Sequence, residues 1–153
     1  MLFSGSMTLN AEPARVWDFL LDVNAFAACV PGVQNVTQID DRTFEGAIEA
    51  TVCPISGEFP FRAHIEESNP LTELSARVEG TDSVTKSTID AELSLTLVPI
   101  ETSHTELAYR AVVNIHGRLA IIGDMVIRAT AALMLDEFTN RVRRNLESDM
   151  AAV

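Results

Sequence analysis

The sequence predicts an α+β fold in which a curved antiparallel sheet wraps around one long C-terminal helix, with two short helices after the first strand. The middle of the chain alternates apolar and polar residues with a period of two, which is typical of strands with one buried face. From Gly123 onward the apolar residues instead recur every three or four positions, which indicates a helix of about twenty-five residues. Such a helix is about 37 Å long, so it can cover the dry face of a sheet.

The N-terminal region predicts a strand and then two short helices. Residues 2–10 alternate loosely between apolar and polar side chains, as in a strand. Pro13 favours a helix start. Backbone N–H groups in the first turn of a helix have no helical partner, so proline loses no hydrogen bond there. A second short helix is expected over residues 24–30, and the Pro31-Gly32 pair ends it.

About six further strands are predicted, and five alternating segments carry the signal. In each, the apolar side chains fall on one face and most polar or charged ones on the other. The alternating segments are 43–52, 59–66, 74–78, 88–97 and 107–115. Because they are consecutive and their connections are short, an antiparallel sheet with one solvated face is expected.

Composition predicts one domain, residues 1–153, of an ordinary soluble type. The net charge of −11 argues against nucleic-acid binding, which needs a basic face. This charge comes entirely from residues 1–117, since residues 118–153 carry five arginines and five acidic residues. With neither a targeting segment nor a long apolar span, and with two cysteines beside apolar residues, we expect a cytoplasmic protein without a stable membrane anchor.

Five short segments carry a family resemblance. They are Phe3-Ser4-Gly5, residues 11–22 (AEPARVWDFLLD), residues 29–32 (CVPG), residues 52–57 (VCPISG) and residues 117–123 (GRLAIIG). In this order and spacing they resemble the family of the carbon monoxide dehydrogenase G-subunit. The order of elements is similarly that of the helix-grip, START-like (SRPBCC) fold, which lipid carriers and polyketide cyclases share.

The resemblance implies a non-enzymatic accessory protein that has no cofactor of its own. It implies binding of a hydrophobic small molecule, lipid or quinone-like, in a cavity between the sheet and the long helix. It also implies a partner of the molybdenum hydroxylase class, such as carbon monoxide dehydrogenase.

A set of apolar and aromatic residues is expected to line that cavity. The set is Trp17, Phe44, Phe59, Phe61, Tyr109, Leu119, Ile122, Met125, Val126, Ala129, Leu133 and Phe138. Tyr109 would offer its hydroxyl to a carbonyl or quinone oxygen, because a buried tyrosine hydroxyl needs a hydrogen-bond partner.

A gate is predicted where the Pro31-Gly32 turn faces the start of the long helix. Gly117 and Gly123 bound the apolar run there, and glycine permits unusual backbone angles. This segment is expected to move when the ligand enters.

Two alternatives remain open. A cyclase or dehydratase in the same fold would need an ionisable group in the cavity, with Asp136 and His116 as candidates. A pure protein-interaction module would instead have a filled core. A metal site is not expected, because the three histidines lack a second ligand at metal spacing, and Cys29 and Cys53 are interpreted as small buried apolar residues.

Overall fold

The computed structural model contains seven strands and four helices and describes residues 1–52, 55–82, 86–101, 103–121 and 123–151. The elements follow the order β1 (Leu2–Leu9), α1 (Pro13–Leu21), α2 (Val23–Cys29), β2 (Val33–Gln38), β3 (Thr43–Val52), β4 (Ile55–Asn69), β5 (Glu73–Asp82), β6 (Ser87–Glu101), β7 (His104–His116), α3 (Arg118–Ile121) and α4 (Asp124–Ala151).

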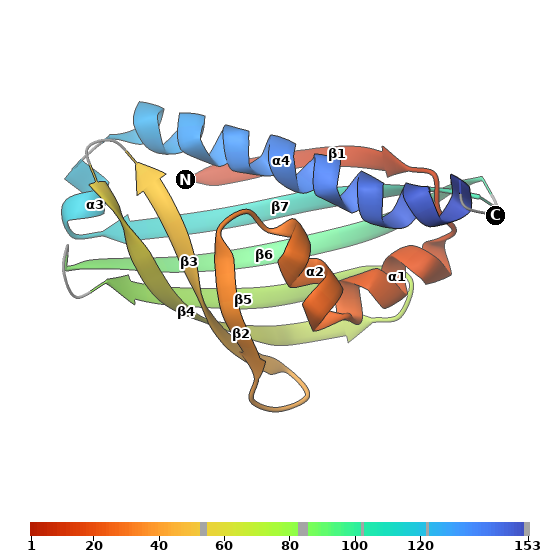
Figure 1. Cartoon of the computed structure of the whole chain (residues 1–153), viewed down its shortest axis with the longest axis horizontal. Helices are drawn as coiled ribbons and strands as arrows, with labels where there is room; N and C mark the ends of the chain where they lie inside the picture. Colours follow the sequence, from red (N-terminus) through yellow and green to blue (C-terminus); the bar gives the residue numbers. More distant parts are fainter. Residues whose placement is uncertain (53–54, 83–85, 102, 122, 152–153) are drawn as a thin grey trace.

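The strands form one antiparallel sheet in the order β1-β7-β6-β5-β4-β3-β2. β1 and β2 are therefore its two edges. Figure 1 shows α1, α2 and α4 together on one side of the strands, with β2 and β3 passing in front of the long central strands. This arrangement confirms the predicted fold, a curved antiparallel sheet combined with a long C-terminal helix.

The alternation along the strands matches the observed faces. Leu95 of β6 lies opposite Leu74 of β5 and Tyr109 of β7, and all three belong to or pack against the main core. The same parity places Phe61 and Ala63 of β4 on this inner face. The period-two pattern therefore identified the inner face because alternate residues of a strand share one side of the sheet.

Local chemistry explains the two short helices. Pro13 occupies the first turn of α1, as predicted. Asp22 ends α1 and begins α2, where its carboxylate accepts a hydrogen bond from the backbone N–H of Ala25 at 3.2 Å. β2 was not singled out in the sequence, and the run from Gly117 forms the separate short helix α3 before α4 begins.

Candidate functional site

One end of the inner face is closed by helices. Val16, Trp17 and Leu20 of α1 are buried there, together with Val142 and Leu146 of α4. An aromatic chain continues the contact from α1 through α2 to α4. The Phe19 and Phe26 rings are 6.0 Å apart, and the Phe26 and Phe138 rings meet edge-to-face at 5.6 Å.

The middle of the inner face is less well covered. Phe44 and Phe61 lie on this face but are only half-buried. Val78 and Val113 are also on this face and half-buried. Phe59, by contrast, is buried, as is Trp17 at the closed end. Large apolar side chains therefore remain accessible on the face that the helix was expected to cover.

The exposure of residues in the first half of α4 corrects the prediction for Met125 and Leu133, whereas the places of Val126 and Ala129 stay predictions. Met125 is 84% exposed, Leu133 is 72% exposed, and Val126 and Ala129 are exposed as well. The buried stripe of α4 instead follows Ile127, Val142 and Leu146, with Phe138 packed beside it. The first half of α4 is apolar on both sides, so the three-to-four period alone did not decide which side faces the sheet.

Two other predicted positions remain predictions. Ile122 lies outside the described residues, and so does Cys53. Leu119 falls within α3 (Arg118–Ile121), and its place in a cavity stays a prediction.

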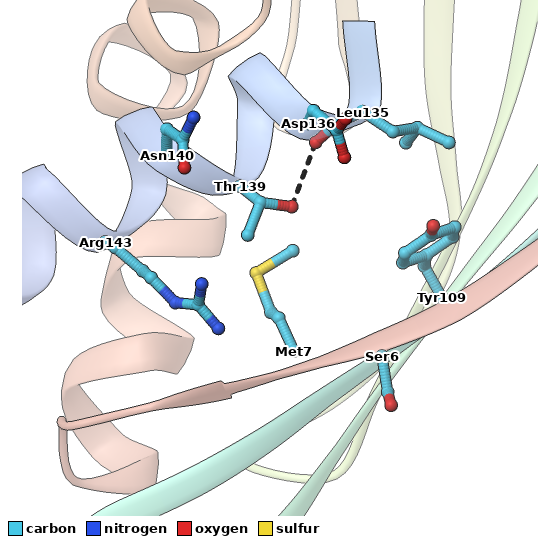
Figure 2. A pocket seen from close by; sticks show the side chains of 8 residues that line it. All are labelled: Ser6, Met7, Tyr109, Leu135, Asp136, Thr139, Asn140 and Arg143. Carbon is cyan, nitrogen blue, oxygen red and sulfur yellow. Dashed lines mark hydrogen bonds between the residues drawn. The ribbon is translucent and has the colours of Figure 1, made fainter. Parts of the chain in front are cut away.

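A groove of about 430 Å³ separates α4 from the edge strand β1 (Figure 2). Side chains from β1, β7 and one face of α4 surround it. Its lining residues are Ser6, Met7, Tyr109, Leu135, Asp136, Thr139, Asn140 and Arg143.

The accessible lining of the groove is mainly polar, and Met7, Tyr109 and Leu135 are its apolar members. Met7 points toward α4 and Tyr109 rises from β7, whereas Ser6 points away from the helix (Figure 2). Asp136 and Arg143 place opposite charges on the α4 side. A molecule with a polar end matches such a lining, and an apolar part attached to it would contact Met7, Tyr109 and Leu135.

Gly5 determines where the Tyr109 ring lies. A Cβ atom added at Gly5 would stand 2.6 Å from the Tyr109 hydroxyl oxygen and 2.8 Å from Cζ. The ring therefore lies directly against the Gly5 backbone, and this close approach requires glycine or a displaced ring. The segment Phe3-Ser4-Gly5 thus helps to position a tyrosine about a hundred residues away in the sequence.

The predicted gate residues have unusual backbones but are not equivalent. Gly32, Gly117 and Gly123 have φ values of +81°, +95° and +99°. Gly32 is fixed against β3, where its carbonyl accepts from the Glu49 N–H at 2.8 Å, and Gly117 packs against the backbone of Lys86. Gly123 has no atom within 4 Å of an added Cβ, so it is the least constrained of the three.

The helix that precedes the predicted gate contacts α4 away from its start. α2, which precedes Pro31, contacts the second half of α4 through Phe26 and Phe138. Arg141 also donates to the Ala28 carbonyl oxygen at 3.4 Å. These contacts place α2 against the second half of α4. Movement of the segment from Gly117 to Gly123 stays a prediction.

Ionisable groups outside the groove form ordinary surface contacts. His64 bonds the Thr43 hydroxyl at 3.0 Å on the outer face, and His116 is exposed at the end of β7. Among the described residues, no group of three metal-binding side chains occurs. Cys29 is buried, and burial raises the pKa of its thiol, although nearby Arg141 and Arg144 act in the opposite direction.

The family model of the carbon monoxide dehydrogenase G-subunit (CoxG) matches residues 5–147. The chain belongs to the CoxG family. No curated protein matches the sequence. The family assignment thus rests on a match over nearly the whole described chain.

Solved structures confirm the fold of this CoxG family member. A conserved protein from Geobacillus kaustophilus superposes with a TM-score of 0.88 at 20% identity, covering 97% of this chain and 96% of that one. A START superfamily protein from Mycobacterium smegmatis gives 0.69 at 11% identity over 96% and 97%. The Zhui aromatase/cyclase from Streptomyces sp. R1128 gives 0.68 at 14% identity over 96% and 93%. Proteins described in different functional terms therefore share this fold.

The helices of the described chain include none that combines the length and apolar character needed to cross a bilayer.

Asp136 and Tyr109 were named as cavity candidates from the sequence, whereas the other groove residues were not predicted. Asp136, Asn140 and Arg143 follow one another at helical spacing, and this spacing was the available signal that they share a face. Met7 carried no such signal, because only the pairing of β1 with β7 brings it beside the helix.

Proposed function

We propose that this CoxG family member binds a hydrophobic small molecule, lipid or quinone-like, between the inner face of the sheet and α4. It does so without catalysing a reaction and acts as an accessory to a molybdenum hydroxylase such as carbon monoxide dehydrogenase. The observation that carries the proposal is the half-burial of Phe44 and Phe61 on a face that a helix-covered core would bury. Large apolar side chains left accessible in a concave region are typical of ligand sites.

The ligand's polar end would lie at the groove. Tyr109 belongs to the groove lining and packs against the main core, so its ring joins the apolar interior to the mainly polar groove. Its hydroxyl is a donor for a carbonyl oxygen of the ligand. Met7 and Leu135 supply adaptable apolar contact next to it.

Magnitudes favour reversible binding. A ligand that buries about 300 Å² of apolar surface gains about 7–8 kcal/mol before costs. Association consumes about 4 kcal/mol or more of that gain. The remaining affinity is weak for a small head group and grows with the length of an apolar tail, which suits a carrier that must release its cargo.

Native mass spectrometry of the purified protein, followed by extraction of the bound molecule, tests the proposal. We expect an isoprenoid quinone or fatty acid at one equivalent. Phe61→Trp should reduce this loading because the larger ring fills the inner space, whereas Leu133→Trp should not, because Leu133 is on the outer surface. Equal loading of both variants, or no loading after incubation with excess quinone, would contradict an interior site.

The proposed partnership needs a separate test. Sedimentation of the protein with purified carbon monoxide dehydrogenase should show a complex at micromolar concentrations. Independent sedimentation of the two proteins would contradict the accessory role. It would not affect the proposed ligand binding.

A cyclase-type enzyme is the second candidate, because Asp136 lines the same groove as Tyr109. A carboxylate and a phenol beside a bound polyketide could exchange protons with it. Turnover of a poly-β-ketone substrate that Asp136→Asn abolishes would favour the enzyme, and absence of turnover would favour the carrier.

A further inference from the structure

β1 presents an open backbone edge. Met1 exchanges both of its backbone hydrogen bonds with Val113, its N-terminal nitrogen donating at 2.7 Å and its carbonyl accepting at 2.8 Å. Hydrogen-bonded and non-bonded pairs alternate along an antiparallel ladder, so the backbone groups of the odd-numbered residues of β1 hydrogen-bond to β7. The N–H and C=O groups of Leu2, Ser4, Ser6 and Thr8 therefore point away from the sheet.

Arginines of α4 cover the two ends of this edge. Arg128 donates to the Leu2 carbonyl oxygen at 3.2 Å and stacks over the Phe3 ring, with 5.3 Å between its guanidinium carbon and the ring centre. Arg143 donates to the Thr8 carbonyl oxygen at 3.5 Å. Folded proteins commonly protect sheet edges in this manner, because an open edge pairs with other chains.

The centre of the edge is left uncovered. Ser4 and Ser6 are exposed, and within the described part of the chain their outward N–H and C=O groups have no hydrogen-bond partner. Ser6 also lies on the groove between β1 and α4. Two donors and two acceptors thus lie along the open edge, about 6.8 Å apart, and Ser6 stands beside the groove of about 430 Å³.

The charge at this edge contrasts with that of the molecule. The chain carries −11, yet Arg128 and Arg143 stand at the ends of the open segment. Across the β1–β7 pair, Arg110 lies opposite Ser4 and Glu106 opposite Thr8. Asp136 is the acidic member of the groove lining. An acidic occupant is therefore favoured at the ends of the segment, away from Asp136.

We propose that this edge binds an extended, acidic peptide segment of a partner protein, which adds as a strand to β1 beneath α4. Only an extended backbone supplies alternating acceptors and donors at the spacing of Ser4 and Ser6. Carboxylates at the ends of the segment would pair with Arg128 and Arg143. This site adjoins the groove proposed for the ligand's polar end, since Ser6 and Arg143 line that groove, but pairing along the β1 backbone does not require the ligand.

A second copy of the chain is disfavoured as the occupant. Edge pairing of two copies would bring together two molecules that each carry −11. Self-association therefore enters only as an outcome of the experiment.

The test starts from a random eight-residue peptide library displayed on phage and selected on the intact protein. Selected peptides are then synthesised, and their binding is measured by fluorescence anisotropy. We expect sequences that alternate Asp or Glu with apolar residues. Binding should slow amide hydrogen exchange at Ser4 and Ser6.

Matched variants separate backbone pairing from other contacts. Ser6→Pro removes the outward N–H and should weaken binding at least about tenfold, whereas Ser6→Ala keeps that N–H and should bind like the wild type. Arg143→Gln leaves the backbone intact and should weaken acidic peptides about threefold to tenfold. Arg62→Gln, on the opposite face of the sheet, should have no effect.

Several results would overturn the proposal. These are equal binding by Ser6→Pro and Ser6→Ala, unchanged exchange at Ser4 and Ser6 on binding, or a library from which no peptide is enriched. Protection of these two amides that rises with protein concentration, together with a dimer mass in sedimentation, would instead identify a second copy as the occupant and would also overturn it.

Discussion

The two halves of α4 are parts of one continuous helix but have different surroundings. The second half, residues 136–147, buries Val142 and Leu146 and contacts α2 through Phe138. The first half, residues 124–135, buries Ile127 and leaves Met125 and Leu133 on the surface. An apolar helix face is therefore not necessarily a buried one, and the packing partners decide which face the sheet covers.

Polar contacts strengthen the same contrast. In the second half, Arg141 reaches the Ala28 carbonyl oxygen and Glu147 accepts the Asn10 N–H at 3.1 Å. In the first half, Arg128 reaches the Leu2 carbonyl oxygen. The second half is tied to both α2 and the end of β1, so it acts as the anchor of the helix.

The largest expected difference comes from the same substitution in the two halves. Leu146→Ala should lower the free energy of unfolding by about 2–5 kcal/mol, because it leaves a cavity at a side chain that is 2% exposed. Leu133→Ala should change it by less than about 0.5 kcal/mol. Urea unfolding followed by circular dichroism measures both, and similar losses would show that the two halves are equally packed.

A second experiment concerns the one buried anchor of the first half within the described chain. Ile127 packs with Met1, Ile89 and Ile115 in a small separate cluster. Ile127→Ala should cost about 2 kcal/mol, the lower end for such truncations because the cluster is small, and should speed amide exchange mainly in the first half of α4. Exchange that speeds equally in both halves would contradict a separate local unit.

The aromatic contact between α2 and α4 should give a smaller effect. Phe26 and Phe138 meet edge-to-face at 5.6 Å, so their coupling should be about 0.5–1.5 kcal/mol beyond the burial of each ring. A double-mutant cycle with Phe26→Leu and Phe138→Leu measures it. A coupling energy of zero would mean that α2 is held by its backbone contacts instead.

The smallest expected effect is pH-dependent. The Arg141 side chain donates to Glu137 at 2.9 Å, and this hydrogen bond, with nearby Arg144, lowers the pKa of the Glu137 carboxyl. A carboxyl with a lowered folded pKa stabilises the fold above its unfolded pKa, and this contribution is lost as pH falls through the folded value. Glu137→Gln should therefore be slightly less stable than the wild type at pH 7 and equal to it at about pH 2.

The control for that experiment is the same substitution in an Arg141→Gln background. There the difference between pH 7 and about pH 2 should shrink, because the main partner of Glu137 is gone. An unchanged difference would assign the pH dependence to other carboxyl groups.

Apart from β2 and α3, the strands and short helices could be predicted from local sequence, whereas the packing of α4 could not. The alternation around Phe61 and Leu95 identified the inner face because a strand has only two sides. A helix has a continuous circumference, and around Met125 and Leu133 it is apolar on more than one side. In the first half of the helix the predicted cavity residues Met125 and Leu133 are therefore exposed.

The candidate groove shows the same limit. Asp136, Asn140 and Arg143 share a helix face in the sequence, but Ser6, Met7 and Tyr109 join them only through the β1–β7 pairing. The open backbone of Ser4 and Ser6 is equally invisible in the sequence, because any strand might lie at an edge or in the centre of a sheet.

Residue periodicity and short local segments were enough to predict the α+β class, the inner face of the strands, the two short helices and the resemblance to the CoxG family. Three other features emerged only from the folded chain: the buried side of α4, the position of Tyr109 against Gly5, and the partly open edge at β1. All three depend on contacts between residues far apart in the chain, which local periodicity does not encode.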